Sequence, residues 1–190
     1  MNKASPLLDQ EQAKLLHTFV AKALFACKQS HCDLQVAVTM LCTCIKSLTE
    51  EDWKKLFRML QYIKSSLKDV LVLCADNLSI VKWYVNASSV VHPNFKSHTG
   101  VAKTYGAGVS IAVSHKQKLN MRSCTKAELV GVEDGINIIL GTKLFLEAQG
   151  YHIKITWCSR MTREQFSWKL TVSGVPVVEL VRLLSITFLS

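Results

Sequence analysis

The sequence has no acidic residue between Asp76 and Glu128, and seven basic residues lie in that interval. Over the whole chain 23 Lys and Arg residues outnumber 14 Asp and Glu residues, so the formal net charge is +9. This excess favours an anionic partner, of which nucleic acid is the usual one, although charge alone does not identify it. Because Glu128 is the first carboxylate after the basic run, this region could bring a metal ion and a polyanion together.

Proline and glycine are also scarce, with 3 Pro and 8 Gly in 190 residues. This composition excludes a long flexible linker. A hydrophobic content of 49% with 19% charged residues excludes a compositionally disordered chain. The length allows one domain of ordinary size, or one and a half small ones.

Cysteine pairing motifs are absent, since none of the 7 Cys residues forms a Cys-x-x-Cys pair. The odd number of cysteines and the missing pairs favour a reducing compartment, so we expect an intracellular protein, cytoplasmic or nuclear. Cys42 and Cys44 are too close together for a zinc knuckle, and we expect buried apolar thiols there. The sequence shows no signal peptide and no apolar run of 18 residues, so we expect no membrane association.

The first third of the chain has the apolar spacing of three helices. Asp9 can cap the first helix, Asp33 can open the second, and Thr49 can open the third. The third helix also carries Lys54, Arg58, Lys64 and Lys68 outside its apolar stripe. Two interpretations remain open for these residues, a solvated basic face or a surface that lies along a phosphate backbone.

After Leu67 the apolar residues alternate, as they do in strands. We expect strands over residues 69–74 and 79–85, then one near residues 98–105 and one over residues 109–114. A Thr125-x-x-Glu128 capping box predicts a long helix that ends before Gly150. Its predicted buried face is Leu129, Val132, Ile136, Ile139, Leu140 and Leu144.

Three blocks of this sequence resemble the end of the polymerase polyprotein of copia-type retrotransposons, where the last helices of the reverse transcriptase run into a ribonuclease H domain. The helical block includes DLQVAVTMLCT and EDWKKLFRMLQYIKSSL, the first-strand block is VKWYVNASSVVHP, and the most specific block is HKQKLNMRSCTKAELVGVEDGI. The resemblance covers roughly residues 8–154. One departure is His31-Cys32-Asp33-Leu34, which stands where the family has Arg-Pro-Asp-Ile.

The resemblance implies an α/β (α+β) fold, with a ribonuclease H-like mixed sheet and a long helix, incomplete at the C-terminus. A small three-helix segment precedes it. The expected organisation is a connection-like helical segment over residues 1–68, a partial ribonuclease H-like domain over 69–154, and a tail over 155–190. In such a sheet the strand that carries Asn86 is central.

The family cleaves the RNA strand of RNA–DNA hybrids with two Mg²⁺ ions held by carboxylates. The resemblance assigns the metal-binding helix glutamate to Glu128, for which a capping role toward Thr125 is the alternative. Asn86 stands where the family has its first-strand aspartate. Because an amide is neutral and offers one carbonyl oxygen, Asn86 impairs the metal site.

The expected partner is an RNA–DNA hybrid or another nucleic acid. The basic residues expected to contact it are Lys96, Lys103, Lys116, Lys118, Arg122 and Lys126.

The third family ligand lies in a Gln-Asp-Asn run that does not occur after Lys154. Adding one G before the Ile155 codon and back-translating gives DNLVFQDDQRAILLE, which resembles the missing motif. The single-codon residues Trp157, Met161 and Trp168 force three matching residues in that frame. We therefore expect a frameshift near Ile155 and out-of-frame sequence from there on. A tail specific to this lineage is the alternative.

These observations predict a remnant of a retrotransposon ribonuclease H that is catalytically inactive, although whether any enzymatic activity survives is left open. A basic nucleic-acid-binding module without catalysis is the second hypothesis. A helical interaction protein with no nucleic-acid role is the third, and it explains neither the block around Glu128 nor the second reading frame.

Overall fold

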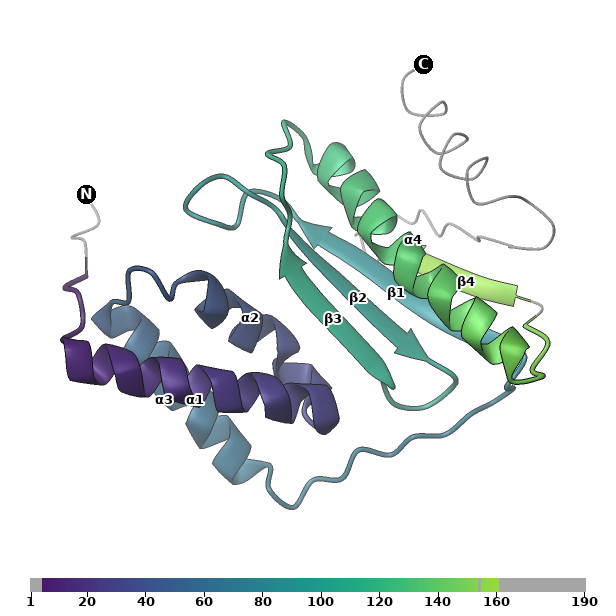
Figure 1. The fold of residues 1–190 in the computed structure, drawn as a ribbon, viewed down its shortest axis with the longest axis horizontal. Helices are drawn as coiled ribbons and strands as arrows, with labels where there is room; N and C mark the ends of the chain where they lie inside the picture. Colours follow the sequence, from purple (N-terminus) through teal and green to yellow (C-terminus); the bar gives the residue numbers. More distant parts are fainter. Residues whose placement is uncertain (1–4, 154, 161–190) are drawn as a thin grey trace. The chain divides into compact units, whose positions relative to one another are not determined.

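The structure of the chain is a computed structural model that describes residues 5–153 and 155–160. Its fold is mixed α+β, with helices and one mixed sheet (Figure 1). The chain divides into two compact units. Of the described residues, the first contains 5–72 and 111–116, and the second contains 73–110, 117–153 and 155–160.

The first unit contains the three helices that the apolar spacing predicts. They are α1 (Gln10–Gln29), α2 (Gln35–Thr43, after a 3₁₀ turn η1 at Cys32–Leu34) and α3 (Glu50–Ser65). Two of the three expected caps are present: the backbone N–H of Gln12 donates to Asp9 Oδ1 over 2.7 Å, and Thr49 forms a capping box with Asp52. Asp33 does not cap the second helix, because it lies inside η1 and the residue before α2 is Leu34. The helices share one apolar core of Leu16, Val20, Ala23, Cys27, Leu34, Val38, Leu41, Leu48, Leu56 and Met59.

Strand β3 (Ile111–Lys116) groups with the first unit, and the other strands belong to the second. These are β1 (Ile80–Ser88), β2 (His98–Thr104) and β4 (Ile155–Arg160). Within the second unit β1 lies between β2 and β4, antiparallel to β2 and parallel to β4. Strand β1 is therefore central, as expected, and its residues 80–85 are paired with β4 rather than left as an edge.

Helix α4 (Cys124–Ala148) packs on one face of this sheet, against β1 and β2 (Figure 1). The prediction that Gly150 stops this helix is confirmed. Gly150 has φ of +87°, its N–H donates to Glu147 O over 3.0 Å, and the N–H of Tyr151 donates to Leu146 O over 3.0 Å. These two bonds form a Schellman motif, in which glycine adopts the left-handed conformation without steric cost.

Two sequence-based expectations about these elements are wrong, and a third is confirmed only in part. The N-cap of α4 is Ser123, whose Oγ accepts from the N–H of Lys126, so Thr125 and Glu128 do not form the capping box. On the predicted buried face of α4, Ile136 and Ile139 are buried as expected, whereas Leu144 is 65% exposed and small residues such as Gly131 and Gly135 are buried. Residues 69–74 form no strand. No hydrogen bond within the described part of the chain involves residues 70–73, so their β-forming side chains have no strand to pair with.

Candidate functional site

Glu128 lies in the second turn of α4 and is only 7% exposed. Because Ser123 caps the helix, the capping role does not explain why Glu128 is there. A carboxylate is seldom buried to this degree unless other polar groups stabilise it. The position marked out by the sequence is therefore a buried carboxylate near the start of the helix, beside the sheet.

A buried network of polar side chains reaches the backbone of Ala127, the residue before Glu128. Gln117 Nε2 donates to the carbonyl oxygen of Ala127 over 2.7 Å and to Thr99 Oγ1 over 3.0 Å. Thr99 Oγ1 in turn donates to Asp134 Oδ2 over 3.2 Å. Gln117 and Thr99 are 1% and 0% exposed, so these bonds join β2 to α4 in the interior. Sequence reasoning missed this network, because the residues are separated by up to 35 positions along the chain.

The side chain of Asn86 lies on the face of the sheet that points away from α4, the helix that carries Glu128. On β1 the side chains of Val85 and Ala87 face α4, since they are the nearest neighbours of positions Gly135 and Gly131 on that helix. Successive side chains of a strand point to opposite faces. The side chain of Asn86 therefore points away from α4, and the residue is exposed.

Within the described residues, Asn86 and Glu128 do not fit a two-metal centre. Such a centre needs several carboxylates around two cations. Here the first-strand position is an amide, and it faces away from the helix that holds Glu128. No group of three or more His, Cys, Asp or Glu residues in the described ranges could hold a metal ion. The motif expected for the third ligand falls largely in residues 161–190, which lie outside the described residues.

Three of the predicted phosphate-contacting residues are exposed near the start of α4: Lys118, Arg122 and Lys126. Lys96 is half-buried in the loop before β2, and Lys116 is half-buried at the end of β3 in the first unit. These five positions remain a prediction, because a partner is needed to test them.

Lys103 is not at the surface, contrary to the sequence-based expectation. It is 7% exposed, and its Nζ lies 5.9 Å from the ring centre of Trp83 and 5.0 Å from that of Tyr105. Its Nζ also donates to the hydroxyl of Tyr105 over 3.4 Å. Burial lowers the pKa of Lys103, because desolvation disfavours the charged amine. This residue faces the interior and cannot contact a phosphate in this conformation.

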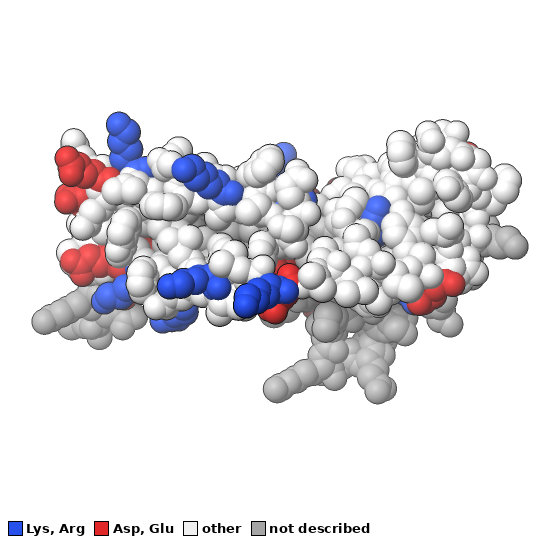
Figure 2. Space-filling view, turned by 90° about the horizontal axis from the view of Figure 1, so that it is seen from below, with Lys and Arg blue, Asp and Glu red and all other residues white. Residues whose placement is uncertain are grey.

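The helical unit carries its own basic surface. Lys54, Arg58, Lys64 and Lys68 are all exposed, and Figure 2 shows Lys and Arg side chains gathered over the helical unit on the face drawn there. Exposure fits both interpretations of this surface, a solvated face and a phosphate-contacting one.

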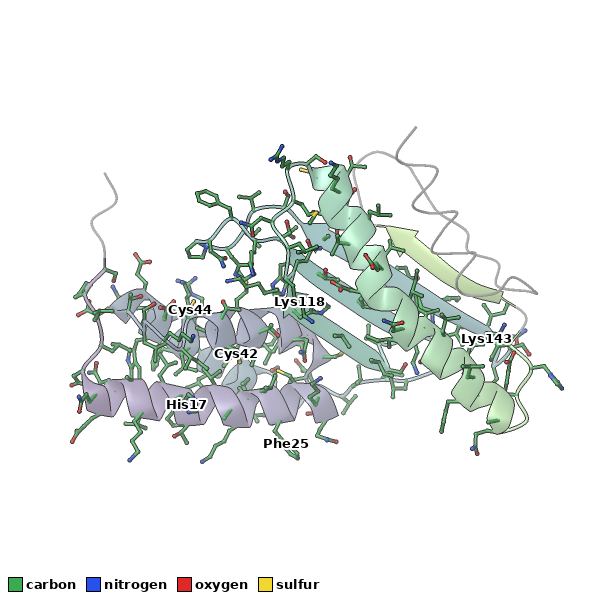
Figure 3. All side chains as sticks on the ribbon, turned by 45° about the horizontal axis from the view of Figure 1, so that its top comes forward. His17, Phe25, Cys42, Cys44, Lys118 and Lys143 are labelled. Carbon is green, nitrogen blue, oxygen red and sulfur yellow. The ribbon has the colours of Figure 1, made fainter. Side chains whose placement is uncertain are left out.

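The thiols are only partly as expected. Cys27 is buried, and burial raises its pKa to about 11. Cys42 and Cys44 are half-buried on α2 and just after it (Figure 3), and burial raises the pKa of Cys42. Cys74 and Cys124 are exposed.

Comparisons with known proteins found no match to this chain among family models, curated proteins or solved structures. In the part of the chain that the structure describes, no helix is long and apolar enough to cross a membrane. The site must therefore be interpreted from its own geometry.

Proposed function

We propose that this chain is a remnant of a retrotransposon ribonuclease H that keeps the scaffold of the enzyme and has lost catalysis. The observation that carries the proposal is the topology of the sheet. A strand hairpin, and a parallel strand that returns after a long helix, place the Asn86 strand between β2 and β4. The resemblance implied this central position for that strand, and Glu128 is buried near the start of the long helix.

Loss of catalysis follows from the charge of the site. Two divalent ions held roughly 3.5–4 Å apart repel each other and need several carboxylates to neutralise them. Asn86 contributes no charge and faces away from α4, so Glu128 is left without the first-strand carboxylate of the family. Mg²⁺ is the family cofactor, and we propose that this chain does not bind it productively. The absence of Cys-x-x-Cys pairs supports an intracellular location.

An assay of the purified chain on an RNA–DNA hybrid, with Mg²⁺ or Mn²⁺, tests this proposal. We expect no cleavage above the rate of a heat-denatured sample. Cleavage by the purified chain that disappears in the Glu128→Ala variant would show that a working metal site remains, and the proposal would then be wrong.

A second candidate function is a basic nucleic-acid-binding module without chemistry. The exposure of Lys118, Arg122 and Lys126 favours it. Binding to a hybrid duplex should then weaken steeply with salt, with a log–log slope of about −0.9 per phosphate neutralised. An affinity no higher than that of an unrelated protein of equal net charge would count against this function.

A further inference from the structure

Two loops of the second unit leave the same end of the sheet (Figure 1). Residues 89–97 join β1 to β2, and residues 117–123 lead into α4. They are tied together by two hydrogen bonds: the N–H of Gln117 donates to Ser97 O over 2.9 Å, and Asn120 Nδ2 donates to Asn94 O over 3.3 Å. The two loops therefore form one continuous surface.

The loop between β1 and β2 presents an aromatic side chain to solvent. Phe95 is 69% exposed, and its φ of 59° lies in the left-handed region that a bulky residue rarely adopts. Strained backbone of this kind persists where the surrounding structure holds it, and it is concentrated at functional sites. Phe95 differs from the other exposed aromatic residues, such as Phe25, in its strained backbone, and this makes it a candidate for contact with a ligand.

Hydrogen bonds within the loop, and a contact between two buried histidines, hold residues 89–97 in this conformation. The N–H of Phe95 donates to His92 O over 2.9 Å, and the N–H of His92 donates to Lys96 O over 3.2 Å. The rings of His92 and His98 are buried, with 3.0 Å between Nε2 of the first and Nδ1 of the second. These bonds order the loop before any ligand binds, which lowers the entropy cost of binding.

The neighbouring loop and the first turn of α4 supply positive charge. Lys118, Arg122 and Lys126 are exposed there, and residues 77–127 contain no carboxylate. The nearest carboxylate in sequence, Glu128, is buried. The surface around Phe95 therefore favours an anionic ligand that also offers a flat apolar face.

We propose that Phe95 and these three basic residues form a binding site for single-stranded nucleic acid, in which one base stacks on the Phe95 ring and neighbouring phosphates lie near Lys118, Arg122 and Lys126. Aromatic platforms beside basic grooves are the general means of binding single strands, because every base has a π-face. A base within a duplex is already stacked on both sides and cannot use the ring. This inference rests on the proposed nucleic-acid role and specifies the form of the ligand.

The test measures binding of the full chain to a fluorescently labelled single-stranded RNA and to an RNA–DNA hybrid of the same sequence. Phe95→Leu keeps an apolar side chain and removes the aromatic ring, whereas Phe95→Tyr keeps the ring. Phe25→Leu is the matched control, because Phe25 is an equally exposed aromatic residue, 70% exposed, on α1 of the other unit (Figure 3).

We expect Phe95→Leu to weaken single-strand binding about fivefold or more, and Phe95→Tyr and Phe25→Leu to leave it nearly unchanged. Binding to the hybrid should not depend on the ring. The Lys118→Gln, Arg122→Gln, Lys126→Gln triple variant should reduce the steepness of the salt dependence of single-strand binding by up to about 2 units of log–log slope.

The outcomes separate this inference from the proposed function. If the hybrid binds and Phe95→Leu binds the single strand like the natural chain, the stacking site is wrong and the nucleic-acid role stands. If neither ligand binds, both are wrong. If Phe95→Leu weakens binding of polyglutamate as much as binding of RNA, the surface recognises acidic protein segments and the inference is overturned.

Discussion

Lys103 is buried in the second unit, and within residues 5–153 no carboxylate forms an ion pair with it. Its recorded contacts are the hydroxyl of Tyr105 and the rings of Trp83 and Tyr105. Cation–π contacts of this kind contribute about 0.5–2 kcal/mol and offset only part of the cost of removing an ammonium from water. This lysine is therefore expected to lower the stability of the unit at neutral pH.

The free-energy cost of burying Lys103 falls as the pH rises. Because burial lowers the pKa of Lys103 from about 10.5, the folded chain releases this proton at a lower pH than the unfolded chain does. Between the two pKa values the unfolded state binds more protons, so the contribution of Lys103 to stability rises with pH. Below this window the full cost is present.

We predict that Lys103→Met stabilises the protein by about 1 kcal/mol at pH 7 and that this advantage shrinks toward pH 10. Urea unfolding at both pH values measures the difference, and Lys118→Met at an exposed site is the control. An advantage that stayed constant between pH 7 and pH 10 would show that burial does not lower the pKa of Lys103 in the folded chain.

Asn86 is the second residue with a testable consequence. We predict that Asn86→Asp alone does not restore hybrid cleavage, because the new carboxylate lies on the face of the sheet away from α4. Each 1.4 kcal/mol of missing transition-state stabilisation lowers the rate about tenfold. Measurable turnover by this single variant, with Mg²⁺ or Mn²⁺, would mean that the side chain turns toward Glu128 during the reaction.

At the level of elements, α4 approaches the sheet closely because its contact face contains glycine. A Cβ at Gly131 would lie 3.2 Å from Ala87 Cβ, and one at Gly135 would lie 3.4 Å from Val85 Cγ2. A Cβ at Gly141 would have nothing within 4 Å. The same residue type therefore has different roles along one helix.

We predict that Gly141→Leu raises the stability by about 0.7 kcal/mol through helix propensity. Gly131→Leu should lower it by about 2 kcal/mol, because the added side chain would overlap β1 and β2. Chemical denaturation of the two variants measures this contrast. Similar effects at the two positions would show that α4 does not pack on the sheet through Gly131.

Local chemistry explains what could be predicted of these elements. The caps at Asp9 and Thr49 depend on side chains within three residues, so the sequence indicates them directly. The predicted Thr125 cap of α4 was wrong, because Ser123 and Thr125 can both cap a helix and local sequence does not choose between them. The predicted strand over residues 69–74 was wrong, because side chains of high β-propensity form a strand only where a neighbouring strand pairs with them.

The candidate site was predicted less well than the fold. The position of Glu128 followed from a short motif, but its burial and the network of Gln117, Thr99 and Asp134 depend on contacts between distant segments. Asn86 is separated from Glu128 because of the register of its strand. A shift of one residue would move the Asn86 side chain to the face that α4 covers. The exposure of Phe95 follows from loop geometry that composition does not encode.

At the scale of the whole molecule, β4 completes the sheet with sequence that we propose to be out of frame. Its backbone pairs with β1 from Ile80↔Ile155 to Val85↔Arg160. Backbone hydrogen bonds do not depend on side-chain identity, so a strand with a suitable pattern can fill this place. The expectation of a poorly ordered tail concerns residues 161–190, which lie outside the described residues.

We predict that Cys158→Pro removes hydrogen-exchange protection from the β1 amides, because proline cannot donate within the sheet and disrupts its pairing. Val72→Pro is the matched control, since no hydrogen bond of the described chain involves residues 70–73. Hydrogen exchange of the two full-length variants measures the effect. Unchanged β1 protection in Cys158→Pro would show that β4 does not hold the central strand.

The extended segment before β1 has a consequence for the lifetime of the chain. Residues 70–73 are exposed, with Val70 at 82%, and they lack hydrogen bonds within the described chain. Proteases cleave exposed backbone that they can bind in extended form. We therefore expect a protease to cut the chain at this segment without prior unfolding of either unit.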